Sequence, residues 1–166
     1  ATLLGNLDRI SDHAASRGVV AAIHPHVGTM VQTAAEVDRV LAESHVGLCV
    51  DTGHLMVGGA DPVAIVDAHT DRIVHMHLKD VDARMADRVL TGDLPFGDAV
   101  AQGLFQPLGR GDVAIDQMVT TLERAGYDGW YVLEQDLRMA EAPSDDGPRE
   151  NVRTSLEFLL AVQVGA

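Results

Sequence analysis

The sequence predicts an α/β protein in which four parallel strands alternate with helices. Four short apolar runs are predicted as strands, and the first, residues 19–23, shows no polar alternation, as expected for a buried parallel strand. Segments with helical spacing of apolar residues separate the runs. Polar side chains follow each run. Because the ends of parallel strands meet at one edge, we expect these side chains to form a site there.

The elements follow one another along the chain as strand and helix in turn. The predicted strands are residues 19–23, 46–50, 73–78 and 130–133. The predicted helices are residues 2–17, 33–44, 62–69, 115–125 and 149–162. Thr33 and Glu36 have the spacing of a capping box, and Asp61 before Pro62 is a typical helix start.

The last predicted helix carries an apolar stripe that we expect to face the core. Its members are Val152, Leu156, Leu159 and Leu160. A polar loop rich in Pro, Gly and Asp, residues 142–148, precedes this helix.

Residues 80–113 are longer than the usual loop between a strand and a helix. Such segments are commonly functional lids or carry small elements of their own. We expect one short helix at 98–102 and a turn-rich approach to the next helix at 107–112.

Length, charge and cysteine usage limit the class of protein. The 166 residues suit a single domain, and 46% hydrophobic residues suffice for a core. The net charge of −13 argues against binding to nucleic acid or to an anionic membrane. The single cysteine, Cys49, excludes a disulfide within the chain and fits a reducing compartment, so we expect a cytoplasmic protein. No apolar run approaches the length of a membrane span.

Residues able to bind metals or move protons stand at all four strand ends. They are His24 and His26, Asp51 and His54, His75 and His77, and Glu134 and Asp136. Two carboxylates with one or two imidazoles suit a divalent transition metal better than calcium. The candidates to orient the metal-binding histidines are Asp80, Gln135 and Asp136.

Two cations close to these strand ends have two interpretations each. Near a metal, Lys79 would bind a substrate oxygen or stabilise an enolate. Arg110 would also contact the substrate. Both residues are otherwise ordinary solvated loop cations. His13, His45 and His69 lie on predicted helices or helix ends and are left out of the site.

Four motifs together resemble a known superfamily. They are DTGH at 51–54, HMHLKD at 75–80, PLGRGDV at 107–113 and GYDGWYVLEQD at 126–136. In residues and spacing the chain resembles the xylose-isomerase-like TIM barrels of sugar isomerases and epimerases. Within this superfamily it is most similar to the inosose dehydratase subgroup.

The resemblance implies a (β/α)8 barrel, of which residues 1–166 would supply strands five to eight, the C-terminal half. A complete barrel typically needs ~250 residues and eight strands. We therefore expect a piece of a longer protein, or a half barrel that another chain completes, including another copy of this one.

The resemblance also assigns roles to individual residues. It implies one divalent metal, manganese or cobalt first, with zinc, iron or magnesium as alternatives. The implied ligands are Asp51, His77 and Glu134, with His24 where related epimerases carry a glutamate. Glu134 would also be the base, and His26 a ligand or acid. The implied substrate contacts are His54, Lys79 and Arg110.

The implied activity is a metal-dependent lyase that removes water from 2-keto-myo-inositol (inosose) through an enediolate. A ketose isomerase or epimerase shares the first half of this chemistry and is the main alternative. A non-enzymatic sugar-binding protein is another alternative. A zinc endonuclease acting on apurinic DNA is disfavoured by the acidic charge. The expected partner is a small polyol or sugar ketone.

Overall fold

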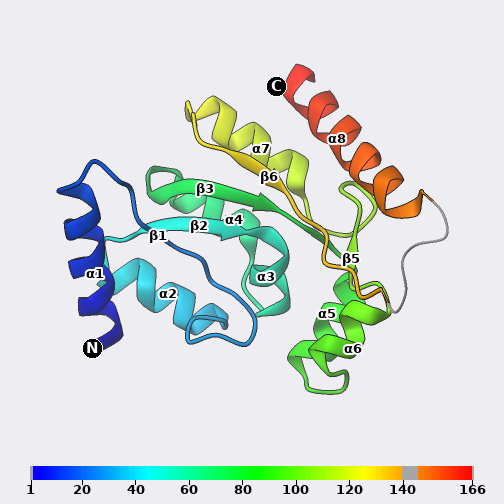
Figure 1. The fold of residues 1–166 in the computed structure, drawn as a ribbon, viewed down its shortest axis with the longest axis horizontal. Coiled ribbons are helices and arrows are strands. Elements are labelled where there is room, and N and C mark those ends of the chain that lie inside the picture. The colour runs from blue at the N-terminus through cyan, green and yellow to red at the C-terminus, as the bar shows by residue number, and fades with distance from the viewer. Residues whose placement is uncertain (1, 140–145, 166) are drawn as a thin grey trace.

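A four-stranded parallel sheet, in the order β1-β2-β3-β6, forms the centre of the fold (Figure 1). The computed structural model describes residues 2–139 and 146–165. The strands are β1 Ala22–Ile23, β2 Gly47–Asp51, β3 Ile73–Leu78 and β6 Tyr131–Leu133. The predicted fold class, an α/β fold with a parallel sheet, is confirmed.

One helix precedes the first strand and the others lie between or after the strands of this sheet. They are α1 Thr2–Ala15, α2 Ala34–Glu43, α3 Thr52–Val57, α4 Pro62–Ala68, α7 Ile115–Arg124 and α8 Gly147–Gly165. A 3-10 turn, Thr70–Arg72, leads into β3. The helices predicted in the sequence are therefore confirmed, and α3 is an additional one.

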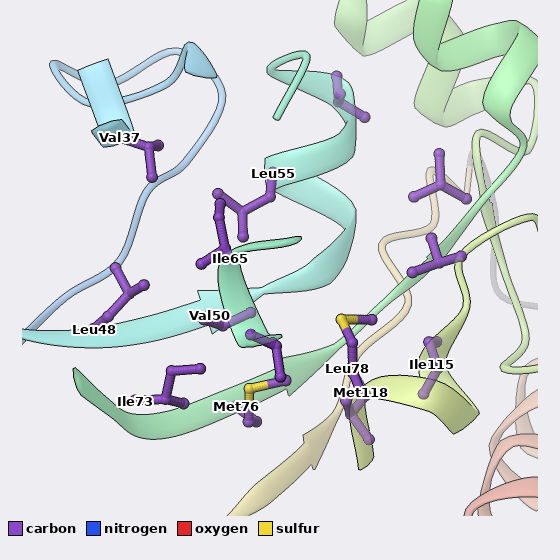
Figure 2. Close-up of a cluster of buried hydrophobic side chains, with 14 of the residues drawn as sticks. Val37, Leu48, Val50, Leu55, Ile65, Ile73, Met76, Leu78, Ile115 and Met118 are labelled. Atoms are coloured by element: carbon purple, nitrogen blue, oxygen red, sulfur yellow. The ribbon is translucent and has the colours of Figure 1, made fainter. Parts of the chain in front are cut away.

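The two faces of the sheet differ because side chains alternate along each strand. On β2 and β3, Val50, Met76 and Leu78 are fully buried and belong to the hydrophobic core. Figure 2 shows Val50 and Met76 in one cluster with Leu55 of α3 and Ile65 of α4. The opposite face of the same strands carries the polar side chains that form the candidate site.

The helix starts agree with the local sequence signals. The Glu36 carboxylate accepts the backbone N–H of Thr33 at 2.8 Å, and the capping box is confirmed. Asp61 accepts the N–H groups of Val63 and Ala64, and Pro62 follows it as predicted. Each interaction satisfies donors that the first turn of a helix leaves without partners.

The first strand is shorter than predicted. Residues 19–23 were expected as a buried strand, but only Ala22–Ile23 pair with β2. Val19 and Val20 are 58% and 73% exposed. The apolar run is present, but no described part of the chain covers it at this edge of the sheet.

Residues 80–113 contain more structure than the single short helix predicted. Strands β4, Asp80–Val81, and β5, Phe105–Gln106, pair in antiparallel fashion. Between them lie α5, Ala83–Leu90, and α6, Phe96–Ala101. Figure 1 shows this lobe beyond the ends of the sheet strands, on the same side as the polar motifs.

Helix α8 faces the solvent with most of its predicted core stripe. Leu159 is buried at 7% exposure, as expected. Val152, Leu156 and Leu160 are 58%, 46% and 51% exposed, so the prediction that they face the core is wrong for the described chain. The helix lies against α7 and β6 (Figure 1). Residues 142–145 of the predicted polar loop lie outside the described residues.

Among the described helices, none is long and apolar enough to cross a membrane.

Gly58 offers a test of how tightly α3 packs against the preceding loop. A Cβ at this position would lie 2.0 Å from the carbonyl oxygen of Gln32, which is backbone and cannot move aside. We expect Gly58→Ala to lower the free energy of unfolding by about 1–3 kcal/mol in urea titrations.

Gly5→Ala is the matched control, because nothing lies within 4 Å of a Cβ built at Gly5 in helix α1. This variant should be neutral or gain up to ~1 kcal/mol from helix propensity. Equal stabilities of the two variants would contradict the close approach at Gly58.

Candidate active site

Three strand ends bring a histidine and two carboxylates together. One ligand atom each from Asp51, His77 and Glu134 lies within 4.8 Å of the others. The strand register causes this, since Asp51 is the partner of His77 in the β2–β3 pair. The Glu134 N–H donates to the carbonyl of Leu78 at 3.0 Å, which fixes the end of β6 beside the end of β3.

The two histidines that follow β1 border this cluster. His24 Nε2 lies 3.4 Å from Asp51 Oδ2, and the rings of His24 and His77 are 4.7 Å apart between centroids. The centroid of the His26 ring lies 3.5 Å from that of the His54 ring, and the two ring planes are tilted by 35°. The expected gathering of polar residues from four strand ends is therefore present in the structure.

A buried lysine lies among the carboxylates of the cluster. Lys79 is 2% exposed, and its Nζ lies 3.3 Å from Asp51 Oδ2, 3.0 Å from Glu134 Oε2 and 3.1 Å from Asp136 Oδ2. The same nitrogen is 3.1 Å from His54 Nε2. A buried ammonium is costly unless it is paired, and here it is paired with three carboxylates.

The DTGH motif, residues 51–54, packs around this lysine. The Thr52 hydroxyl donates to the carbonyl of Lys79 at 2.8 Å and accepts its N–H at 2.9 Å. A Cβ at Gly53 would lie 2.8 Å from the Lys79 side chain, so only glycine leaves room for it. The Asp51 carboxylate also caps helix α3 by accepting the His54 N–H at 2.9 Å. The motif therefore supplies the Asp51 carboxylate of the site and positions Lys79 beside it.

Asp51 and Lys79 each stabilise the charged form of the other. Burial opposes ionisation of Asp51, but contacts with His24 and His77 and the charge of Lys79 hold the pKa of Asp51 well below its usual range. Burial likewise opposes the charge of Lys79, yet Asp51 and Glu134 raise the pKa of Lys79 above its ordinary value. At neutral pH the buried Asp51 carboxylate is therefore ionised beside the Lys79 ammonium.

Two buried groups beside these charges are neutral at physiological pH. Burial lowers the pKa of His54 to about 4, so its Nε2 accepts a hydrogen bond from the Lys79 ammonium. Burial also raises the pKa of Cys49 to about 12, with the charges of Asp51 and Glu134 acting in the same direction. The free Cys49 side chain is therefore a protonated thiol.

The donor atoms fit a divalent transition metal. Two carboxylates and an imidazole from separate strands are the mixed oxygen and nitrogen ligands that such ions bind. His77 Nδ1 is buried and has no hydrogen-bond partner in the part of the chain that the structure describes, and an unpaired buried nitrogen is costly. It lies 3.2 Å from Glu134 Oε1, so a cation bound there would satisfy both atoms. His24, beside Asp51, is in place to be a fourth ligand.

The three residues predicted to orient the metal-binding histidines form other interactions in the structure. Asp80 is fully buried and accepts the N–H groups of Gly109, Gly111 and Val113 at 2.9–3.0 Å. It therefore holds the 107–113 segment and contacts no site histidine. Gln135 donates to the Phe105 carbonyl at 3.2 Å.

Asp136 pairs with Lys79 instead of a histidine. All three of these interactions join residues distant in sequence, which a strand-end pattern does not reveal.

The predicted substrate contacts differ in their access to solvent. Lys79 and His54 are buried, at 2% and 1% exposure, and Lys79 pairs with carboxylates of the cluster. Arg110 is exposed, in the segment that Asp80 holds. Within residues 2–139 and 146–165, Arg110 forms no ion pair with the cluster.

The remaining histidines lie where the sequence indicated. His75 faces the same side as His77, with ring centroids 5.2 Å apart, but stands outside the Asp51 ligand group. His45 pairs with Asp8 and Asp12 of α1.

With its fold and site described, the chain can be placed among known proteins. Residues 1–162 match the family described as Xylose isomerase-like TIM barrel. The chain belongs to this family, which confirms the resemblance noted in its motifs.

Two curated relatives illustrate the similarity. The chain is 38% identical over 135 residues to inosose dehydratase of Geobacillus thermodenitrificans, covering 80% of this chain and 45% of the relative. It is 42% identical over 130 residues to the rhizopine catabolism protein MocC of Rhizobium meliloti, covering 77% of this chain and 40% of that protein. The chain thus spans about half the length of the curated relatives it matches.

Solved structures show the same fold. A D-tagatose 3-epimerase-like protein superposes with a TM-score of 0.64 at 18% identity, covering 96% of this chain and 52% of that one. The IolI protein with a bound zinc atom superposes with a TM-score of 0.62 at 21% identity, covering 94% and 53%. The four-stranded sheet is therefore part of a barrel of this kind.

Removal of the Lys79 charge should destabilise the protein strongly. In metal-free buffer, Lys79→Met leaves the fully buried Asp51 carboxylate without its ammonium partner. We expect the free energy of unfolding to fall by about 3–5 kcal/mol in urea titrations.

Arg9→Met is the control, because Arg9 is an exposed cation on helix α1. It should change the stability by no more than about 0.5 kcal/mol. A Lys79→Met variant as stable as this control would show that the buried charge is not needed.

Proposed function

We propose that this chain carries the metal-binding half of a divalent-metal-dependent dehydratase that acts on a cyclic polyol ketone of the inosose class. The convergence of Asp51, His77 and Glu134 from three strand ends is the observation that carries the proposal. The curated relative named inosose dehydratase, 38% identical to this chain, supports the choice of substrate.

The proposed ligands are Asp51, His77 and Glu134, with His24 as the fourth. Manganese or cobalt suits this set of oxygen and nitrogen donors, and zinc, iron or magnesium are the alternatives. When bound, the cation would polarise the ketone oxygen of the substrate and so acidify the neighbouring C–H group.

Glu134 is the proposed base. Its side chain is 30% exposed, against 17% for His77 and 0% for Asp51, so of the two ligand carboxylates Glu134 is the one open to a substrate. Its carboxylate takes the proton from the carbon next to the ketone. The Lys79 ammonium lies 3.0 Å from Glu134 Oε2 and pairs with this carboxylate.

His26 is the proposed acid. Its Nδ1 lies 2.7 Å from the carbonyl oxygen of Val27, which can only accept, so Nδ1 carries a proton. Nε2 is then free to hold the second proton and deliver it. The C–O bond at the next carbon breaks, the departing hydroxyl takes the His26 proton, and one water leaves for each proton that Glu134 removes.

Lys79 and His54 act as positioning residues in this scheme. Lys79 favours the ionised form of Asp51 and pairs with Glu134, and His54 accepts a hydrogen bond from Lys79. Arg110, exposed on the segment held by Asp80, is the proposed contact for substrate hydroxyl groups.

The rest of the barrel completes the site in this proposal. Residues 1–166 form one domain unit that supplies strands five to eight, and a segment of the same protein or another chain supplies the other strands. We place this enzyme in the cytoplasm, in agreement with a free buried cysteine.

The test is an assay of the purified protein with Mn²⁺ or Co²⁺. Inosose should give a new ultraviolet absorbance from a dione product, and free ketoses should give none. Asp51→Asn should reduce the turnover at least about 100-fold, in the range of losses reported for a lost charge-stabilising group. Asp87→Asn, an exposed change on α5, is the control and should retain activity.

Two results would overturn the proposal in different ways. Isomerised ketoses without a dione signal would assign the protein to the isomerase or epimerase alternative. Retained sugar binding in Asp51→Asn, with no divalent ion in the wild-type protein by metal analysis, would indicate a non-enzymatic binding protein.

A further inference from the structure

The sheet face that carries the candidate site also carries a cysteine that the proposed reaction does not use. Cys49 precedes Asp51 by two residues on β2 and therefore points to the same face. Its register partner on β3 is His75, two residues before His77. Cys49 is 7% exposed and forms no disulfide.

Cys49 belongs to a second group of metal-ligating atoms. One ligand atom each from His24, Cys49 and His77 lies within 4.8 Å of the others. This group shares His77 with the group formed by Asp51 and Glu134. It differs in chemistry, since it has a sulfur and two imidazoles and no carboxylate.

We propose that His24, Cys49 and His77 form a second metal site, which takes a thiophilic divalent cation such as zinc or cadmium and for which cobalt serves as a spectroscopic probe. Soft thiolate ligands select these ions over magnesium or manganese, which prefer oxygen. On binding, the S–H bond breaks, the sulfur–metal bond forms, and the proton is released to solvent.

The two metal sites exclude each other because both use His77. A thiophilic cation held by Cys49 withdraws His77 from the group of Asp51 and Glu134, and also takes His24 from the side of Asp51. Ions such as manganese would fill the carboxylate site, whereas excess zinc or cadmium would fill the sulfur site. This second site would make the protein sensitive to the identity of the available metal.

Cobalt titration under anaerobic conditions tests this site independently of catalysis. A thiolate bound to Co²⁺ gives a sulfur-to-cobalt charge-transfer band in the near ultraviolet, which oxygen and nitrogen ligands do not give. We expect this band in the wild-type protein and its complete loss in Cys49→Ser. The zinc dissociation constant of Cys49→Ser should rise at least about 10-fold, the lower end of the loss seen for partners outside the ligand sphere.

Glu134→Gln is the matched variant, because it alters the carboxylate group and leaves His24, Cys49 and His77 in place. It should keep the charge-transfer band. Circular dichroism and urea unfolding check that each variant is folded, and a Cys49→Ala variant replaces Cys49→Ser if the serine variant is not.

The outcomes separate this inference from the proposed function. Absence of the charge-transfer band in folded wild-type protein overturns the sulfur site, whether or not visible cobalt absorption shows binding elsewhere. A band that persists in both cysteine variants also overturns it. Visible cobalt absorption without the band leaves the carboxylate site standing. A band with no inosose activity supports the sulfur site and counts against the dehydratase.

Discussion

The buried pairing of Lys79 with three carboxylates is the interaction on which the site depends. An isolated ammonium at 2% exposure would be strongly destabilising, and so would the fully buried Asp51 carboxylate. The attraction between the two charges offsets the cost of burying them. The pairing also connects the ends of β2, β3 and β6. Neighbouring residues position Lys79 for this pairing. The Thr52 hydroxyl forms two hydrogen bonds with the backbone of Lys79, and Gly53 leaves space for the Lys79 side chain.

The two faces of the parallel sheet have different roles in the structure. One face packs apolar side chains from β2 and β3 under α3, α4 and α7, which makes the strands rigid (Figure 2). The other face collects polar side chains from successive strand ends, and this rigidity holds them at fixed distances. The 80–113 lobe is anchored at the same edge, since buried Asp80 binds three backbone N–H groups of the following turn. A site built this way is positioned before any ligand arrives.

The shared His77 connects the proposed reaction with the sulfur-containing site. Because His77 belongs to both ligand groups, only one of the two groups can bind a metal at a time. The softness of the ion then determines which group binds it. Exposed apolar residues at both ends of the sheet, Val20 before β1 and Leu156 on α8, agree with a sheet that is part of a larger barrel.

The sequence by itself determined the parallel α/β class, the helix caps and the polar residues at the strand ends, because each follows from short-range spacing. Apolar runs and capping pairs such as Thr33 with Glu36 act within a few residues. Only the tertiary structure decided that Lys79 is buried, that Asp80 holds a loop, and that β4 and β5 pair in antiparallel fashion. These outcomes depend on partners distant in sequence, such as Asp136, which is 57 residues from Lys79. The burial and the neighbours of a charged side chain are set by packing, and spacing along the chain does not contain that information.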